Sequence, residues 1–175
     1  MASLNSNVKD AVTRLSTANT PNTPKMGTAK EIKRSMIINK LASIEKQIAL
    51  EFVEGAKSAL AELINQDARG FDLPILYRVA HDLYLLRSYK QCLNIIAESP
   101  LNTEVSEDLH LKNLKGMCHM KLEELETAEK LFLACLERDP KFTSSLNNLG
   151  NICMNRREYK RSLEYFSIAK QSRLG

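Results

Sequence analysis

The chain has 175 residues and a mass of 19.8 kDa. Hydrophobic residues make up 43% and charged residues 26%, which excludes a wholly disordered protein. Aromatic residues make up only 6% and Trp is absent, which favours helices over strands. Of the formal net charge of +4, residues 1–30 carry +3 from four basic residues and one acidic residue, so the rest of the chain carries only +1. This balance disfavours a concentrated basic surface, and we expect an all-α protein without a nucleic-acid partner.

Residues 1–29 are rich in Ser, Thr, Asn and Ala and include the segment "ANTPNTPK". The two Thr-Pro steps favour extended backbone and interrupt helix formation, so we expect a flexible N-terminal tail. A second interpretation stays open. A targeting or docking helix would need apolar residues on one face, and four are available: Val8, Ala11, Val12 and Leu15.

Residues 30–71 have the apolar spacing of a helical region. Four apolar residues follow one another at steps of four, three and four: Ile37, Leu41, Ile44 and Ile48. Gly70 is a suitable end for this region. Gly55 either divides it into two antiparallel helices or lies inside one continuous helix, since Gly within a helix costs only about 1 kcal/mol.

From residue 72 the chain alternates helices of about a dozen residues with short turns. Asp72 followed by Pro74 indicates a helix start, because Asp caps free amides and Pro is tolerated in the first turn. Pro100 and Pro140 indicate helix ends. The segment "LNTEVSED" between two helices is expected to be a polar linker. The predicted helices lie near residues 76–86, 89–98, 109–121, 123–139, 142–155 and 158–171.

Two segments near the end of the chain are related by a constant offset in numbering (150 − 116 = 34): "GMCHMKLEELETAEKLF" and "GNICMNRREYKRSLEYF". The first unit places small, aromatic and terminating residues at Gly116, Ala128, Phe132, Cys135 and Pro140, and the second repeats them at Gly150, Ser162, Phe166 and Ala169. At an offset of 36, the preceding unit matches with Ala80, Tyr89, Cys92 and Ile96. This pattern resembles the tetratricopeptide repeat family, whose units are helix-turn-helix pairs with a period of about 34 residues.

The resemblance implies an all-α helical-repeat solenoid of antiparallel helix pairs, with units at about 72–106, 107–140 and 141–175. Residues 30–71 resemble such a unit only loosely, as a possible degenerate repeat with Ala59 and Leu63 in packing positions. The sequence also departs from the family pattern. The large aromatic residue expected early in each first helix is replaced by Leu76, Lys112 and Leu146.

The resemblance also implies a function, that of a non-catalytic protein-interaction module: an adaptor, assembly factor or chaperone-like scaffold that binds a peptide in a concave groove lined by the first helices. Carried over to this sequence, the groove positions are Pro74, Tyr77, Arg78, His81, His110, Asn113, Leu114, Met117, Ser144, Asn147, Asn148 and Asn151. Asn can donate to and accept from a peptide backbone, but it also serves simply to solvate a helix face. Only Arg78 offers a cation, so we do not expect the clamp that holds the carboxylate of chaperone tails.

A second hypothesis is a structural subunit that self-associates or builds a larger complex. Repeat arrays usually end in a helix with a polar outer face, and the last unit has no such helix after it. Either this exposed end meets another subunit or partner, or the sequence is a piece of a longer protein. A homo-oligomer joined through the N-terminal helices and the uncapped C-terminal repeat is therefore the alternative to a peptide-binding adaptor. An RNA-binding helical repeat is a third hypothesis, which the nearly neutral body of the chain disfavours.

The sequence contains no converging set of catalytic or metal-binding residues. Cys118 and His119 are adjacent, so on a helix they point about 100° apart and cannot share a substrate. The four cysteines, Cys92, Cys118, Cys135 and Cys153, contain no CxxC pair and are expected to be reduced thiols packed as small apolar residues. We expect no enzyme activity, no cofactor, no metal and a cytoplasmic location. No apolar run approaches the roughly 20 residues of a membrane helix, so no membrane insertion is expected.

Overall fold

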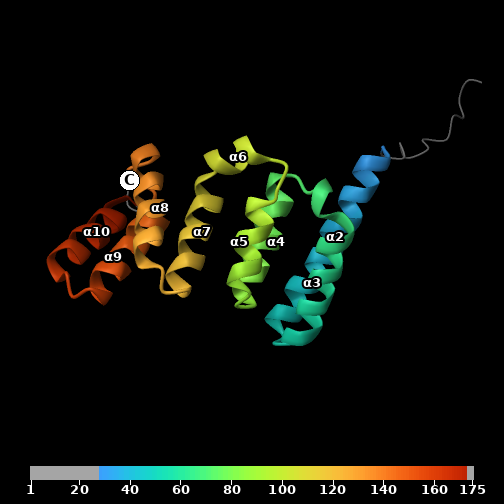
Figure 1. The fold of residues 1–175 in the computed structure, drawn as a ribbon, viewed down its shortest axis with the longest axis horizontal. Helices are drawn as coiled ribbons and strands as arrows, with labels where there is room; N and C mark the ends of the chain where they lie inside the picture. Colours follow the sequence, from blue (N-terminus) through green and yellow to red (C-terminus); the bar gives the residue numbers. More distant parts are fainter. Residues whose placement is uncertain (1–27, 173–175) are drawn as a thin grey trace, which may run out of the picture. The chain divides into compact units, whose positions relative to one another are not determined.

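The computed structural model describes residues 28–172 of the chain. Every regular element in this part is helical, which confirms the predicted fold class (Figure 1). The predicted tail and the alternative targeting helix fall almost entirely outside the described residues. The elements are α2 (Ala29–Ala49), α3 (Val53–Asp67), a 3-10 turn η1 (Ala68–Gly70), α4 (Leu73–Leu85), α5 (Tyr89–Ala97), α6 (Asn102–Glu107), α7 (Leu109–Lys121), α8 (Leu125–Arg138), α9 (Thr143–Asn155) and α10 (Tyr159–Ser172).

The chain divides into two compact units, Met1–Ser35 and Met36–Gly175. In the first unit the described residues form the beginning of α2. The Thr28 amide donates to Glu31 Oε2 at 2.6 Å, and the Glu31 amide donates to Thr28 Oγ1 at 3.3 Å. This reciprocal pair is a capping box, which satisfies two amides that have no partner inside the helix. All further description concerns the second unit.

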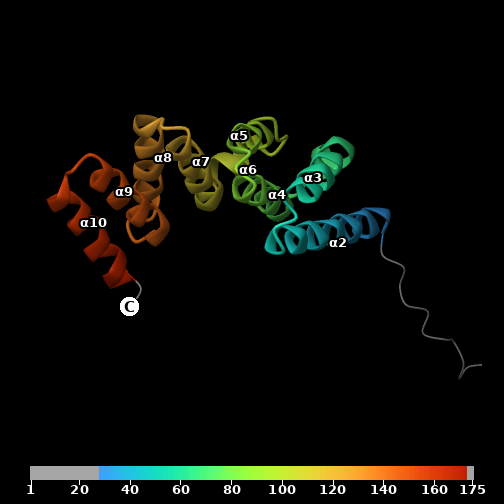
Figure 2. The ribbon, with the colours of Figure 1, turned by 90° about the horizontal axis from the view of Figure 1, so that it is seen from below.

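The second unit is built from consecutive helix pairs. Helix α4 packs with α5, α7 with α8 and α9 with α10, while α5 also lies against α7 and α8 against α9 (Figures 1 and 2). Asp72 and Asp108 cap α4 and α7: their Oδ1 atoms accept hydrogen bonds from the amides of Ile75 at 3.0 Å and Leu111 at 2.7 Å. These caps fix where two of the first helices begin and hence where their groove positions fall.

The polar segment between α5 and α7 is helical, contrary to the linker that we predicted. Residues Asn102–Glu107 form α6, one and a half turns that pack against α7 (Figure 1). Among the side chains of this helix that the structure describes, that of Val105 is buried, with a relative exposure of 9%. A single apolar side chain carries too little periodicity to predict a helix from sequence, but its burial against α7 stabilises the turn.

Residues 36–70 form a further helix pair, and its break does not lie at Gly55. Helix α2 ends at Ala49, Glu51 makes the turn with a φ angle of 62°, and Gly55 lies inside α3. The same left-handed conformation recurs between the helices of the other three pairs, at Arg87, Glu123 and Arg157. After each of these four residues the next amide donates to the carbonyl five residues back: Phe52 to Gln47, Ser88 to Leu83, Glu124 to His119 and Glu158 to Cys153.

The left-handed turn residue, which all four pairs share, gives a common reference for matching residue positions in the N-terminal pair with those in the next pair. The turn residues differ in number by 36 (87 − 51), so Ala56 and Leu60 correspond to Cys92 and Ile96. Both Ala56 and Leu60 are fully buried, whereas Ala59 is half-buried. The packing positions that we assigned to Ala59 and Leu63 are therefore displaced by three residues, almost one helical turn.

Glycine lets the two helices of a pair approach closely. A Cβ atom on Gly116 would lie 2.5 Å from Phe132 Cε1, and one on Gly150 would lie 2.6 Å from Phe166 Cε1, so each ring packs directly against backbone. In the N-terminal pair the turn register puts Ile44 at this position, and its side chain is buried. The larger residue keeps the backbones of α2 and α3 further apart, and a hollow of about 190 Å³ lies between them.

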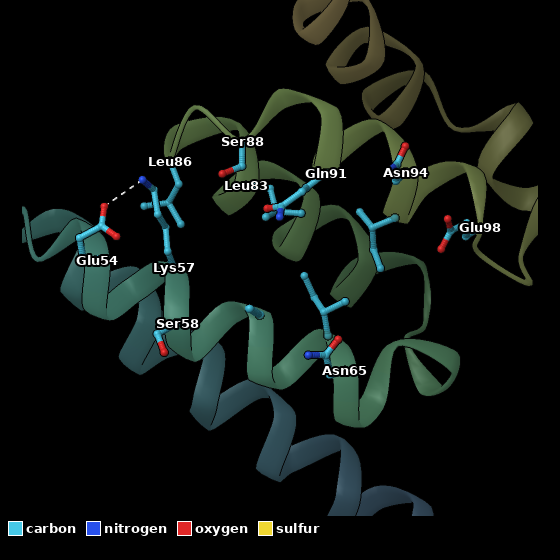
Figure 3. A pocket seen from close by; sticks show the side chains of 13 residues that line it. Glu54, Lys57, Ser58, Asn65, Leu83, Leu86, Ser88, Gln91, Asn94 and Glu98 are labelled. Carbon is cyan, nitrogen blue, oxygen red and sulfur yellow. Dashed lines mark hydrogen bonds and ion pairs between the residues drawn. The ribbon is translucent and has the colours of Figure 1, made fainter.

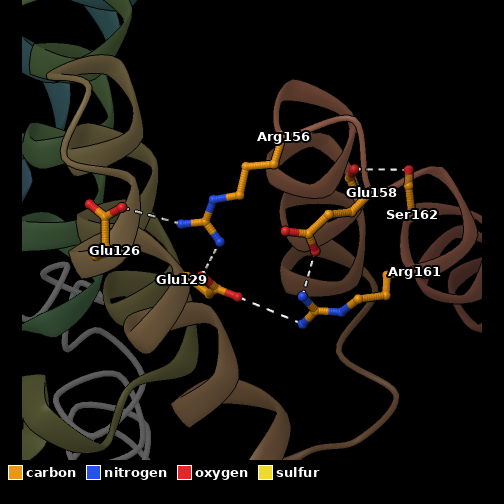
Figure 4. A network of polar contacts seen from close by, with 7 residues as sticks. Glu126, Glu129, Arg156, Glu158, Arg161 and Ser162 are labelled. Atoms are coloured by element: carbon orange, nitrogen blue, oxygen red, sulfur yellow. Dashed lines mark hydrogen bonds and ion pairs between the residues drawn. The ribbon is translucent and has the colours of Figure 1, made fainter.

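Ion pairs join α8 to the last two helices (Figure 4). Arg156 contacts Glu129 at 2.5 Å and Glu126 at 3.5 Å, and Arg161 contacts Glu129 at 3.8 Å and Glu158 at 2.5 Å. Most of these side chains are at least partly exposed, so each pair is expected to contribute only about 0–1 kcal/mol. The array is therefore stabilised chiefly by its apolar core, and the ion pairs add to the specificity of packing.

Candidate functional site

The predicted groove residues belong to α4, α7 and α9. Leu114 is buried in the core and Asn113 is buried as well, while the others lie on the face that these helices form, called here the first-helix face. A row of aromatic rings crosses this face from α4 to the start of α9. Tyr77 stacks on His81 with centroids 6.0 Å apart, and it meets His110 edge-to-face, also at 6.0 Å. His110 in turn contacts the ring of Phe142 at 5.4 Å. The structure thus brings together Tyr77, His81 and His110, which were predicted as separate groove positions. With Phe142 they form an aromatic surface that crosses three helix pairs.

Phe142 belongs to this row although the sequence analysis did not include it. It lies directly before α9, at the position that Asp108 occupies before α7, since their numbers differ by one repeat period (142 − 108 = 34). The period alone could therefore have drawn attention to it. Phe142 extends the aromatic row because an aromatic residue stands here in place of a capping residue such as Asp108. The repeat pattern does not predict that replacement.

A hollow of about 380 Å³ opens beside the rings of Tyr77 and His110. It is lined by Leu73, Pro74, Tyr77, Asp108 and His110. Burial raises the pKa of Tyr77, and the nearby carboxylate of Asp108 raises it further. The hollow thus combines apolar and aromatic walls with one carboxylate.

The asparagines of the face do not share one role. Asn113 is buried, and its Oδ1 atom accepts hydrogen bonds from Ser145 Oγ and from Asn148 Nδ2, each at 3.0 Å. Its own amide nitrogen lies 3.4 Å from the sulfur of Met117. This cluster joins α7 to α9. Asn113 therefore holds two repeats together, and Asn148 is already engaged with it.

The two remaining asparagines differ in exposure. Asn147 is half-buried and lines a small hollow of about 150 Å³ together with Phe166 and Lys170 of α10. Asn151 is exposed and lies one turn further along α9. Of the predicted asparagines, Asn151 is thus the one whose amide is most accessible to a bound segment.

Arg78 is paired rather than free. Its Nε and Nη2 atoms contact Glu45 Oε1 of α2 at 2.9 and 2.8 Å. Asp82, one turn further along α4, is buried, and its pKa is raised to about 7 by burial and by Glu45, with Arg78 opposing the shift. This ionic cluster joins α2 to α4 and leaves the first-helix face with no available arginine among its predicted residues.

A larger hollow, of about 570 Å³, lies between α3 and α5 (Figure 3). Its floor includes Ile64, Leu83, Leu86 and Ile95, and polar residues of both helices surround it, among them Lys57, Ser58, Asn65, Gln91, Asn94 and Glu98. Lys57 is paired with Glu54 at 3.0 Å. Sequence reasoning missed this hollow because it arises from the spacing between two helix pairs. We call it the outer hollow.

Within residues 28–172 no hydrogen bond or ion pair joins a cysteine to a histidine. All four cysteines are buried free thiols, and burial raises the pKa of Cys135 and Cys153. His119 contacts Glu124 Oε2 at 2.6 Å across a turn. No group of three or more potential ligands in the described part could hold a metal ion, and no helix there is long and apolar enough to cross a membrane.

The stacked helix pairs and the face built from their first helices define a helical-repeat interaction scaffold. The sequence model of the tetratricopeptide repeat matches residues 109–142. Residues 109–142 are thus a tetratricopeptide repeat, and the fold around them is that of a tetratricopeptide-repeat solenoid. Repeats of this family are generally protein-interaction modules. No curated protein matches the chain by sequence.

Solved structures support the fold. A crystal structure of MamA superposes with a TM-score of 0.59 at 11% identity, covering 78% of each chain. MamA from Desulfovibrio magneticus RS-1 gives 0.61 at 16% identity, covering 78% of this chain and 75% of that one. PilF from Pseudomonas aeruginosa gives 0.60 at 16% identity, covering 76% of this chain and 59% of that one. At these identities the likeness concerns the fold alone.

Proposed function

We propose that the chain is a non-catalytic adaptor or assembly scaffold of the cytoplasm that binds a peptide segment on its first-helix face. The observation that carries the proposal is the aromatic row of Tyr77, His81, His110 and Phe142, which spans three helix pairs. Aromatic side chains supply large contact areas with little loss of conformational entropy, and they are enriched where proteins bind one another. The exposed amide of Asn151 adds hydrogen bonding to a peptide backbone.

The proposal predicts loss of peptide binding when the asparagines of α9 are truncated. Peptides selected from a random library on the intact chain should bind at least about five-fold more weakly to the Asn148→Ala, Asn151→Ala double variant, since each lost hydrogen bond costs about 0.5–1.5 kcal/mol. Fluorescence anisotropy measures the affinity. Circular dichroism must show unchanged helicity, because Asn148 also bonds to Asn113.

Asn94→Ala is the matched control, because Asn94 lies in the outer hollow and carries the same side chain. Binding unchanged in the α9 variant would contradict the assignment of the first-helix face. Binding lost in Asn94→Ala but kept in the α9 variant would move the site to the outer hollow.

Exposed apolar residues favour the alternative of a self-associating subunit. Tyr159 and Leu163 of α10 are 59% and 68% exposed, whereas Leu125 and Glu129, their counterparts in the preceding unit, are half-buried. Phe52 in the N-terminal turn is 65% exposed. Light scattering would show a mass above 19.8 kDa that rises with concentration if these surfaces pair, and a strict monomer at high concentration would contradict it.

A further inference from the structure

We propose that the hollow between α4 and α7 receives an arginine side chain of the bound peptide, an inference that rests on the proposed function of the first-helix face. The volume of about 380 Å³ lies near the lower end of the range of about 300–1,000 Å³ found for ligand pockets. It therefore has room for one long side chain and not for a folded segment. The lining is apolar and aromatic with a single carboxylate, which suits a side chain with a long stem and a positive end.

The walls of the hollow suit the planar guanidinium group. Tyr77 and His110 meet with an interplanar angle of 74°, so the two rings present surfaces in nearly perpendicular directions. A guanidinium stacks on such rings through cation–π attraction, which is worth about 0.5–2 kcal/mol. Leu73 and Pro74 supply apolar contact for the methylene stem. A lysine could use the apolar contact and the cation–π attraction, but its ammonium group lacks the planar surface that stacks on a ring and the fork that binds a carboxylate through two donors.

Asp108 supplies the opposite charge. Its Oδ1 atom accepts the Leu111 amide at 2.7 Å, and among the described residues the carboxylate forms no ion pair. Carboxylate oxygens accept more than one hydrogen bond, so the cap leaves capacity for the two parallel N–H donors of an arginine. The carboxylate lines the same hollow as the rings of Tyr77 and His110.

The cation nearest to Asp108 on its own helix is Lys112, one turn further along α7, which does not line the hollow. The N-terminal ends of α4 and α7 are positive ends of helix dipoles, but both are capped by carboxylates, Asp72 and Asp108. Arg138 is held by Glu107, through its backbone oxygen and through Oε2 at 3.4 Å, so its charge is already paired. An acidic peptide side chain would instead meet the carboxylate of Asp108. The hollow thus selects for a basic residue and against an acidic one.

A random library of short peptides selected on the intact chain tests the inference. Selection on the wild type should enrich arginine at one position, above lysine and far above Asp or Glu. Asp108→Asn removes the charge but keeps a good capping residue, so it should fold normally and lose the enrichment. Glu137→Gln is the matched control, because Glu137 is exposed on α8, away from the first-helix face.

One selected peptide, resynthesised with citrulline in place of arginine, gives the quantitative test. Citrulline has nearly the same shape without the charge, and we expect it to weaken binding to the wild type about ten-fold. Binding to Asp108→Asn should show little difference between the two peptides. Selected peptides without arginine, or an equal loss with citrulline in Asp108→Asn, would overturn this inference and leave the proposed function intact. Failure to select any peptide that depends on the first-helix face would overturn both.

Discussion

Asp82 is 2% exposed, and its Oδ2 atom has no hydrogen-bond partner within the described residues. The charged groups that act on it are Glu45, which repels a second negative charge, and Arg78, which attracts it. Burial is the largest of these effects and raises the pKa to about 7. The folded protein therefore keeps a proton on Asp82 at pH values at which the unfolded chain has lost it.

This linkage predicts that the stability of the fold decreases between about pH 4 and pH 7 through Asp82. The unfolded chain binds fewer protons than the folded protein in this window, so the free energy of unfolding falls as pH rises and levels off above about 7. Each pKa unit corresponds to about 1.4 kcal/mol, which makes the effect a few kcal/mol at most. Asp82→Asn should be about as stable as the wild type at pH 5 and more stable at pH 8.

Urea denaturation at pH 5, 6, 7 and 8 measures this difference, with Glu137→Gln as an exposed control that should leave the pH dependence unchanged. A constant gap between Asp82→Asn and the wild type across the four pH values would show that Asp82 titrates normally.

Individual residues show what the sequence could not predict about the site. The resemblance to the repeat family placed Tyr77 and His110 on one face, and the structure adds that their rings touch. It also placed Asn113 in the groove, but the period cannot reveal that Ser145 and Asn148 donate to its oxygen. Those bonds depend on how far α9 is shifted along α7. Period fixes which residues share a face, whereas contacts between units depend on helix spacing and rotation.

Helix boundaries followed local signals where such signals exist. The start of α4 was predictable from Asp72 and Pro74, because capping and proline act within one turn. The turn at Glu51 was not predictable, because Gly is the residue that usually adopts a left-handed conformation. Gly55 was therefore the nearby candidate for the turn. The tight approach of two helices was predictable from Gly and Phe at the same spacing in two units, since neither residue type alone implies contact.

Replacing Gly116 or Gly150 with alanine should change the stability of the fold by different amounts. Alanine favours a helix over glycine by about 1 kcal/mol, but overpacking a core costs about 1–3 kcal/mol. Phe132 is fully buried and cannot move away from a new Cβ atom, whereas Phe166 is half-buried and can. Gly116→Ala should therefore destabilise the protein by up to about 2 kcal/mol, and Gly150→Ala should be nearly neutral.

Thermal or urea unfolding gives both values. The double variant Gly116→Ala, Phe132→Leu isolates the clash, because a smaller side chain should make the alanine less harmful than it is in the single variant. An equal cost at both glycines would mean that ring mobility does not decide the outcome.

At the scale of the whole array, we infer that α2 and α3 are a degenerate repeat unit. The pair shares the left-handed turn of the other pairs, and in that register it keeps the buried small and apolar residues Ala56 and Leu60. It differs at Ile44, which stands where the next pairs have Ala80 and Gly116. A single substitution of a small by a large residue at the closest point of approach accounts for the wider spacing, and it obscures the repeat in the sequence.

A linear array transmits stability from each unit to its neighbours, so a loosely packed terminal unit should open before the rest. The N-terminal pair has a hollow of about 190 Å³ between its helices, and Gln47 Oε1 within it is buried without a hydrogen-bond partner in the described part of the chain. By contrast, α7 and α8 pack directly through Gly116 and Phe132.

Amide hydrogen exchange followed by mass spectrometry should therefore show faster exchange in α3 than in α8. We expect a difference of about ten-fold or more, equivalent to at least about 1.4 kcal/mol of opening free energy. Both helices are second members of their pairs and are read in the same experiment, so each controls for the other. Equal protection would mean that the N-terminal pair unfolds cooperatively with the array despite its wider spacing.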